Sequence, residues 1–536
     1  MLAPLLLTLL PILLILILLL IFRTPADISG ILGWLAVCLV AWLWFRTTPE
    51  VILRSTASGL IRSWSVSLIV AASLLQMAVI EKSGALRRIT IFIKTIASEH
   101  RPVQIMMINI GFGTLMVAVG ATPVSVLPPI LVAMGYSTYV AIALPAIGYD
   151  ALCTYALLGA PIVVFVDIAN SFLGAGQEIA LHEAGMVFYM FLPLVATLIG
   201  FCMLWIVGRW EGLKRGLFPC LLTGATIAVV AWFTNRSDNL VVLTGVLCGL
   251  AVMLVMALYL IAGGHPVLDG SRLTDEERDY ARSYPLWRAL LPWALLVVLI
   301  LCLNLPQQSF DWLYRTMKLP IHGLTADGRP LDTRLLWQAY TWILASTLLA
   351  LPFLRLSGGK MREAVQVWLN RAPRPVFAAA IFFAIGEVMN MSGYDMASQS
   401  FATPSMVRVL ADHSALLFQD AYGLVVAFIG LFGGFITGSE ASTIAMFAKY
   451  TLATAKKLEL SREGLLIVTA GLAFGGGLAS VISPAKLQNA AAAIDRIGEE
   501  GVVIRIAFLF ALGLTLITAL FVVLLLWLKG ARIIGG

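Results

Sequence analysis

The chain has 536 residues, of which 60% are hydrophobic and only 12% charged, and its mean hydropathy is +0.94. This composition leaves too few polar side chains to cover a water-soluble protein of this length, so it excludes a soluble globular fold and indicates solvation by lipid. The net charge of +7 does not indicate a nucleic-acid partner, because the positive residues gather in short loops between apolar segments, as the positive-inside rule describes.

Apolar segments of membrane-spanning length recur along the whole chain. About 20 apolar residues in a helix cross the ~30 Å hydrocarbon core, since every backbone group finds its partner within the segment. The predicted segments lie near residues 3–22, 28–45, 63–80, 104–134, 138–166, 187–207, 217–233, 239–263, 288–304, 336–354, 376–392, 415–436, 441–455, 464–482 and 503–528. Residues 1–22 lack a basic leader and a cleavage site, which favours a retained first helix. The sequence therefore predicts an all-α polytopic protein of the cell inner membrane, embedded in the lipid bilayer.

Loop charge predicts the orientation of these segments. The basic loops, all of which we place in the cytoplasm, are Glu81–Pro102, Arg209–Arg215, Arg272–Arg288, Arg355–Arg374 and Lys449–Arg462. Two segments that hold more acid than base, near Asp167–Glu183 and Gly393–His413, are placed on the opposite side.

Two glycine-rich segments, one in each half of the chain, can be aligned with each other. The first contains Gly111–Gly113 and Val119–Ser125, and the second contains Gly433–Gly434 and Thr437–Thr443. Some forty residues after each comes a break of small residues and proline, at residues 159–161 and 483–484. Small residues are also routine in packed membrane helices, but the loop charges predict that these two segments enter from opposite faces, as in the inverted repeats of secondary transporters.

Clusters of Gly and Pro at membrane depth also interrupt a helix, which is tolerated only where the freed backbone faces protein or water. We therefore expect an inverted-repeat secondary transporter with two re-entrant or broken-helix hairpins. The first half, 1–215, would hold a hairpin near 104–134 and the break at 159–161. Residues 216–370 would be connecting helices and loops, and the second half, 371–536, would hold a hairpin near 430–448 and a break at 483–486.

Such breaks are suited to binding anions. A helix that begins at mid-membrane exposes unpaired N–H groups and the positive end of its dipole, about half a charge, where little screens it. Glycine lets a small carboxylate approach closely, and Ser and Thr hydroxyls supply donors that select among small hydroxy acids. The segment from Thr437 to Thr443 is the strongest candidate, because it places hydroxyls beside a carboxylate.

Four charged residues interrupt the apolar segments: Glu440, Lys486, Asp150 and Glu387. Each costs at least ~2.5–3.5 kcal/mol on insertion scales, so each is a functional candidate. Burial would favour the neutral form of Glu440, which could then take up and release a proton as a carrier alternates. Lys486 could be the counter-charge for a substrate carboxylate, or it could pair with Glu440 and brace the two turns. Asp150 and Glu387 could instead pair with a loop arginine.

Several motifs resemble the L-lactate permease family. The run Gly434–Ala448 is similar to that family's Thr-Gly-Ser-Asp motif and the helix that follows it, and Gly475–Ala485 resembles a later segment ending in Ile-Ser-Pro. Asn390–Gly393 matches an Asn-x-Ser-Gly element. The first half follows the family outline more loosely, at Pro123–Tyr136 and at 159–161, and the likeness covers roughly residues 60–210 and 375–530.

The resemblance implies a proton-coupled importer of L-lactate or glycolate, whose two hairpins form the site. Glu440 matches the family's Asp by position. The resemblance also implies kinship with dimeric carriers, so a homodimer is among the expectations. The chain departs from the family at Ala118–Pro123, which is shorter than the family motif and lacks its Glu, and at Lys486, where the family has a polar neutral residue.

These observations define a predicted site. The residues predicted to bind the substrate are Gly120, Thr122, Ser125, Thr154, Asn390, Ser392, Thr437, Gly438, Ser439, Ser442, Thr443, Ser483 and Lys486. The residues predicted to couple a proton to transport are Glu440 and Asp150.

Three other function classes compete with a proton-linked carrier of short monocarboxylates. A carrier of a sulfonate or dicarboxylate would use the extra positive charge of Lys486. A channel would conduct without saturation. A membrane-embedded enzyme would need a catalytic constellation, and the sequence holds no HExxH, no His-x-x-x-His and no nucleophile elbow. We therefore expect no enzyme activity, no cofactor and no metal, with a small organic anion and a proton as the partners.

Overall fold

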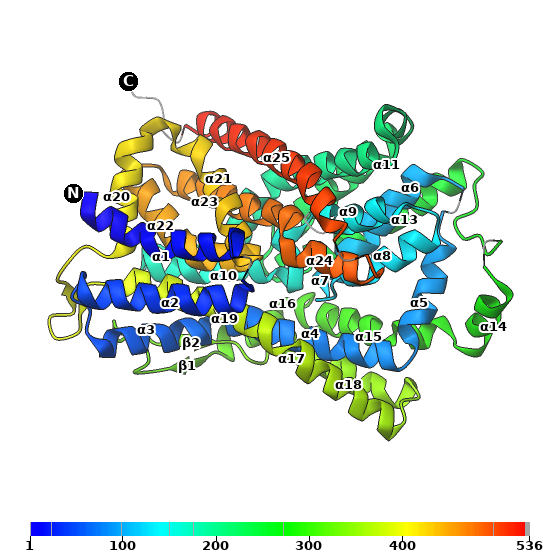
Figure 1. The fold of residues 1–536 in the computed structure, drawn as a ribbon, viewed down its shortest axis with the longest axis horizontal. Helices are drawn as coiled ribbons and strands as arrows, with labels where there is room; N and C mark the ends of the chain where they lie inside the picture. The colour runs from blue at the N-terminus through cyan, green and yellow to red at the C-terminus, as the bar shows by residue number, and fades with distance from the viewer. Residues whose placement is uncertain are drawn as a thin grey trace.

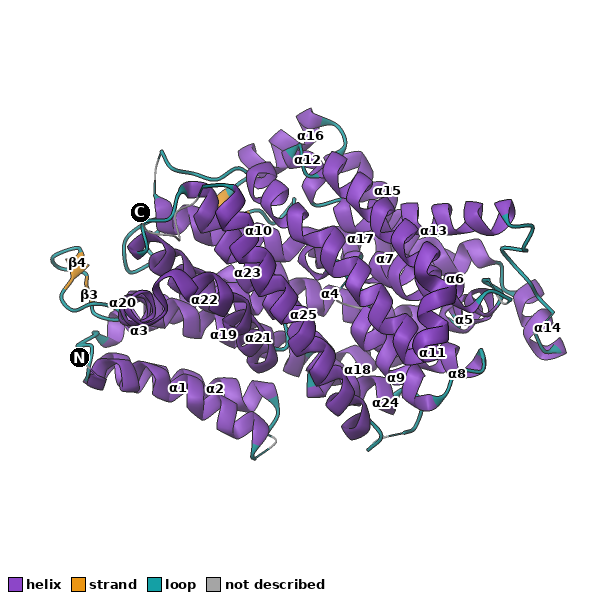
Figure 2. Cartoon of the chain, turned by 90° about the horizontal axis from the view of Figure 1, so that it is seen from above, coloured by secondary structure: helices purple, strands orange, loops and turns teal. Residues whose placement is uncertain are grey.

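The computed structural model describes residues 2–22, 24–97, 99–148, 151–174, 176–271, 273–496 and 498–530. Helices dominate this part of the chain, and ten of the helical segments found in it are long and apolar enough to cross a membrane. The predicted all-α polytopic architecture is confirmed. Most helices run roughly along the long axis of the molecule (Figure 1). Helices α1 (Leu2–Leu20) and α2 (Ala26–Leu43) pack against each other, and Figure 2 shows them at one edge of the bundle.

Most elements of the first half are short, and several lie around breaks. They are α3 (Pro49–Arg62), α4 (Trp64–Lys82), α5 (Ala85–Lys94), α6 (Arg101–Ile105), the π-helix η1 (Met106–Phe112), α7 (Gly113–Ala118), α8 (Pro123–Ala133), α9 (Thr138–Gly148), the 3₁₀ turn η2 (Cys153–Tyr155) and α10 (Ala156–Leu173). Backbone left without helical partners at such breaks must face protein or water, so these positions mark the interior of the molecule.

The middle of the chain contains membrane helices as well as loops. Its elements are α11 (Leu181–Thr234), α12 (Asp238–Val241), α13 (Thr244–Ala262), α14 (Asp275–Ser283), α15 (Leu286–Asn304), α16 (Gln307–Asp311), η3 (Trp312–Thr316), β1 (Leu319–Ile321), β2 (Leu331–Thr333), α17 (Ala339–Ala350), η4 (Leu351–Phe353) and α18 (Gly358–Arg371). The predicted segments 187–207 and 217–233 both belong to α11, which kinks at Arg209, where φ is 49°.

The second half repeats the pattern of helices and breaks. Its elements are α19 (Pro373–Met391), β3 (Tyr394–Asp395), β4 (Ser400–Phe401), α20 (Met406–Phe418), η5 (Gln419–Ala421), α21 (Tyr422–Thr437), α22 (Glu440–Lys457), α23 (Arg462–Leu478), η6 (Ala479–Ile482), α24 (Pro484–Ala492) and α25 (Glu500–Leu528). The strands pair only locally, β1 with β2 and β3 with β4, both antiparallel.

The broken hairpins of the two halves begin at opposite ends of the molecule. In Figure 1, α14 marks one end and α20 the other, and we call these the α14 end and the α20 end. Helix α8 returns to the α14 end, because Tyr136, just after it, donates a hydrogen bond to Gln104 of α6 (2.8 Å). Helix α22 returns to the α20 end, because Lys457 pairs with Asp412 of α20 (3.0 Å).

One predicted loop position is wrong. The loop between α22 and α23 was expected beside the other basic loops, but Arg462 lies 2.7 Å from Glu183, in one of the segments expected on the opposite side. The predicted loop also began too early, because α22 continues to Lys457 and keeps Lys449 buried inside the bundle. The loop is basic even without Lys449, and its cations pair with acids of the two segments expected on the opposite side, Lys457 with Asp412 and Arg462 with Glu183.

Glycines allow the helices of the second half to pack backbone against backbone. A Cβ at Gly430 or Gly434 of α21, or at Gly475 of α23, would overlap a carbonyl of the facing helix. A Cβ at Gly386 of α19 would lie 2.7 Å from the carbonyl oxygen of Ala445 on α22. Such small-residue contacts provide the packing that replaces the hydrophobic driving force inside a membrane, and they fix the position of α22.

Candidate functional site

The break between α21 and α22 is built by three consecutive residues. Gly438 ends α21 in the left-handed conformation, with φ at 69°, which a residue with a side chain adopts only at a cost. Ser439 then caps α22, its hydroxyl accepting from the N–H of Ser442 (3.5 Å). The hydroxyls of Thr437 and Thr443 both donate to the Ser439 carbonyl, at 2.9 and 2.8 Å. Hydroxyls predicted for the substrate therefore also hold the turn together.

Glu440 is the first residue of α22 and is only 2% exposed. Its Oε1 accepts a hydrogen bond from the hydroxyl of Thr154 (2.7 Å), which lies in η2 of the first half. Room for the carboxyl group comes from Gly477 of α23, where a Cβ would lie 2.8 Å from Oε2. The structure thus brings together Glu440 and Thr154, two predicted site residues 286 positions apart.

The first half has its own breaks beside this contact. Gly120 follows α7 with φ at 88°, in the left-handed region, and a Cβ there would lie 3.5 Å from Leu157. Leu157, Leu158 and Gly159 are all left-handed, with φ of 51°, 57° and 75°. For the two leucines this conformation costs roughly 1–2 kcal/mol each, so the surrounding structure holds the segment under strain.

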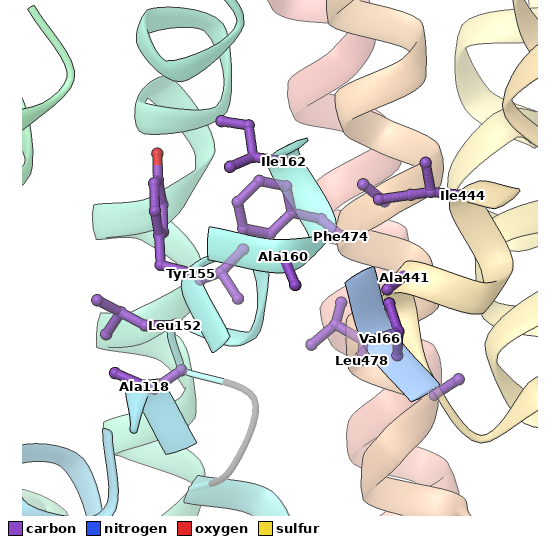
Figure 3. Close-up of a cluster of buried hydrophobic side chains, with 14 of the residues drawn as sticks. Val66, Ala118, Leu152, Tyr155, Ala160, Ile162, Ala441, Ile444, Phe474 and Leu478 are labelled. Atoms are coloured by element: carbon purple, nitrogen blue, oxygen red, sulfur yellow. The ribbon is translucent and has the colours of Figure 1, made fainter. Parts of the chain in front are cut away.

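The breaks of both halves converge on one buried region. Figure 3 shows Ala118 of α7 in the same cluster as Leu152 and Tyr155, which lie around η2, and as Ala441 of α22 and Leu478 of α23. Helices also pack reciprocally across the halves, α10 against α22 and α24 against α8. The helices are interrupted at both Gly120 and Gly438, as the sequence predicted.

Other predicted residues lie close to this region. A Cβ at Gly438 would lie 3.8 Å from the hydroxyl of Ser483, the residue that immediately precedes α24. The hydroxyl of Ser442 is buried and has no hydrogen-bond partner among the described residues. Such a buried donor without an acceptor is available to a ligand.

The remaining predicted residues are placed differently. The Ser392 hydroxyl donates to the Met389 carbonyl (2.8 Å) and accepts from the N–H of Met406 (2.8 Å), so it joins the end of α19 to the start of α20. Asn390 precedes it on α19, Thr122 and Lys486 are half-buried, and Ser125 is exposed. Asp150 lies outside the described residues.

Sequence reasoning singled out Glu387 as a functional candidate or the partner of a loop arginine, but it missed the residue that pairs with it, Lys449. Lys449 Nζ lies 3.0 Å from Glu387 Oε2, and both side chains are buried, at 10% and 11% exposed. The guanidinium of Arg62, at the end of α3, acts electrostatically on both groups, and it forms no ion pair among the described residues. Lys449 could have been recognised from the apolar residues on both sides of it in α22, Met446–Ala448 and Leu452–Ala453. No group of three or more His, Cys, Asp or Glu residues in the described part of the chain could hold a metal ion.

Comparison with known proteins gives a consistent result. A family model described as L-lactate permease matches residues 4–529. The L-lactate permease of Salmonella typhimurium is 22% identical over 528 residues, covering 91% of this chain and 90% of that protein. The glycolate permease GlcA of Escherichia coli is 23% identical over 538 residues, covering 93% and 91%. Among solved structures, MtrF of Neisseria gonorrhoeae, from a class of antimetabolite efflux pumps, matches 88% of this chain and 83% of its own at 13% identity, with a TM-score of 0.41.

Proposed function

The chain belongs to the L-lactate permease family, which makes it a multi-pass transporter of the inner membrane and not an enzyme, and from that premise we propose that it takes up a small monocarboxylate together with a proton. L-Lactate and glycolate are the proposed substrates, because relatives covering about nine-tenths of the chain are named for them. The observation that carries the proton coupling is the burial of Glu440 at a helix break, in contact with the other half of the chain.

We further propose that the two broken hairpins form an inverted repeat. The first runs through α6, η1 and α7 to Gly120 and returns through α8, and the second runs through α21 to Gly438 and returns through α22. They begin at opposite ends of the molecule, and the break of the second hairpin contacts the first half of the chain through the hydrogen bond from Thr154 of η2 to Glu440. A midplane site between such repeats can be opened to either side by rocking one repeat against the other.

In this scheme the substrate and the proton are bound by different groups. N–H groups at the start of α22, the hydroxyl of Ser442 and the glycine backbone at 438 receive the substrate carboxylate. Glu440 binds the proton, because a buried carboxyl group is more easily accommodated neutral than charged. When it loses the proton, the hydroxyl of Thr154 stabilises the carboxylate that forms.

The test is transport by purified protein in proteoliposomes. We expect labelled L-lactate and glycolate to exchange by counterflow and to accumulate when a pH gradient is imposed, with saturation. Glu440→Gln should abolish accumulation and leave exchange intact. The matched control is Glu463→Gln, also in the first turn of its helix but 42% exposed and paired with Lys529, which should behave as the wild type. Equal loss of exchange and accumulation in Glu440→Gln would show that this residue binds or braces instead, and uptake of a small sulfonate alone would overturn the substrate class.

A further inference from the structure

Asn109 is buried in the first half with an unused carboxamide. Its side chain is 1% exposed, and neither Oδ1 nor Nδ2 has a hydrogen-bond partner among the described residues. Buried polar groups are nearly always paired, because the desolvation free energy of an unpaired group is not offset by any hydrogen bond. An unpaired amide at membrane depth therefore requires a ligand or another explanation.

The other buried asparagines of the described chain show what a structural role looks like. Asn304 donates from Nδ2 to the Ile300 carbonyl (2.9 Å) and accepts at Oδ1 from the indole of Trp337 (3.2 Å). Asn235 and Asn239 likewise use both ends of the carboxamide. Asn109 differs from all three, so a role in holding the fold does not account for it.

The position of Asn109 connects it to the site. It lies in the π-helix η1, a local widening of the helix that occurs frequently at functional sites. A Cβ at Gly148, the last residue of α9, would lie 3.2 Å from the Cβ of Asn109. Asn109 therefore packs against the end of α9, and η2, which holds Thr154, begins five residues further along the chain.

A second unused group lies on the next element, α7. The Thr114 hydroxyl is buried, at 5% exposed, and has no partner among the described residues. Threonine hydroxyls in helices commonly bond the carbonyl four residues earlier, as Thr197 and Thr223 do here. Thr114 does not, and it lies in α7, two residues after the end of η1.

We propose that Asn109 is the residue by which this transporter selects 2-hydroxy monocarboxylates. A carboxamide offers one acceptor and one donor group. A 2-hydroxy acid satisfies both, because its hydroxyl donates to Oδ1 and one oxygen of its carboxylate accepts from Nδ2, which leaves the other oxygen for the N–H groups of α22. An acid without the hydroxyl would leave Oδ1 unpaired, and a site built for a hydroxyl rejects such an analogue strongly. This inference rests on the proposed function.

The experiment compares L-lactate with propionate, which lacks only the hydroxyl, as competitors of labelled L-lactate counterflow. In the wild type we expect propionate to compete about 10-fold or more weakly, the factor that one hydrogen bond supplies. In Asn109→Leu and in the smaller Asn109→Ala, the half-saturating concentration of L-lactate should rise and the ratio between the two acids should fall to within about twofold.

Thermal unfolding in detergent separates recognition from structure. Asn109→Leu should keep or raise the melting temperature, because it removes a buried polar group that has no partner to lose. The matched control, Asn304→Leu, should lower the melting temperature, because Trp337 and Ile300 lose their hydrogen bonds to Asn304. It should leave the ratio between lactate and propionate unchanged.

Two results would overturn the inference. One is a ratio in both Asn109 variants equal to that of the wild type, as expected if a water molecule occupies the carboxamide. The other is a wild type that transports L-lactate without preferring it over propionate. A wild type that exchanges no monocarboxylate at all would instead refute the proposed function, so the two failures are distinguishable.

Discussion

Removing either partner of the buried pair between Glu387 and Lys449 should destabilise the protein, by an amount that depends on which partner is removed. We consider Glu387→Gln, Lys449→Met and the double variant. The pair lies between α19 and α22 with a nitrogen-to-oxygen distance of 3.0 Å, and Arg62 acts on both charges. Removing one partner of a buried pair is destabilising mainly because the other charge stays buried without compensation.

The charge balance of the cluster sets the order of the effects. Two cations and one carboxylate give the wild type a net charge of +1, so Glu387→Gln leaves +2, Lys449→Met leaves 0 and the double variant leaves +1. Asp327 also acts on Lys449 but has its own partner, Arg329, at 3.7 Å. We therefore expect Glu387→Gln to cost the full ~3–5 kcal/mol of a broken buried pair, and Lys449→Met to cost about 1–2 kcal/mol because Arg62 still compensates the carboxylate. The double variant should fall between them.

The assay is the apparent melting temperature of each purified variant in one detergent at fixed salt. Lys457→Met is the matched control, since it removes a cation from the same helix whose partner, Asp412, is 38% exposed; a pair of that kind is worth about 0–1 kcal/mol. If Lys449→Met proves as unstable as Glu387→Gln, or the double variant is less stable than both, Arg62 does not compensate Glu387 and the reasoning fails.

Three further predictions concern other parts of the fold. Burial raises the pKa of Asp238, but hydrogen bonds from His182 and Arg315 outweigh it and hold the pKa below the ordinary 3.8. The stability that this lowered pKa contributes is present above about pH 3.8 and is lost as the pH falls through the lower folded value. Melting curves of Asp238→Asn should therefore lie below those of the wild type at pH 7 and approach them in strong acid, and a constant difference would contradict this. Gly475→Val should prevent folding, because its side chain would overlap the Ala427 carbonyl, whereas Gly513→Val, with open space around it, should yield normal amounts of monodisperse protein. Gly438→Ala should lower stability by about 1–2 kcal/mol, the cost of a left-handed alanine, and an unchanged melting temperature would show that the turn relaxes.

Sequence reasoning located the breaks because their chemistry is local. Gly438 followed by Ser439 is the combination that ends one helix and caps the next, and Gly120 before Pro123 signals the same event. Glu440 stood out because a charge in an apolar segment is expensive. The contact between Glu440 and Thr154 could not be predicted in the same way, since it depends on packing between residues far apart in the chain.

The residues that sequence reasoning missed have a weak local signal, as Lys449 does, or none, as Asn109 does. Lys449 precedes Lys456 and Lys457, so it was assigned to the basic loop that contains them. Nothing in the sequence indicates that its partner is Glu387. Asn109 lies in an uninterrupted apolar run, and the π-helix that contains it depends on surrounding packing by α9, α11 and α13. An unpaired carboxamide becomes visible only when all neighbouring donors and acceptors are known.

Helix α22 contains one residue that sequence reasoning found, Glu440, and one that it missed, Lys449. Glu440 and Lys449 are nine residues apart, two and a half helical turns, so they lie on opposite faces about 13 Å apart along the axis. Glu440 faces the first half through Thr154, and Lys449 faces α19 through Glu387. A movement that separates Glu440 from Thr154 must therefore either carry α19 along with α22 or break the pair, at the ~3–5 kcal/mol cost of a buried charge. Because Gly386 of α19 also lets the α22 backbone approach closely, we expect α19 and α22 to move as one body in the transport cycle.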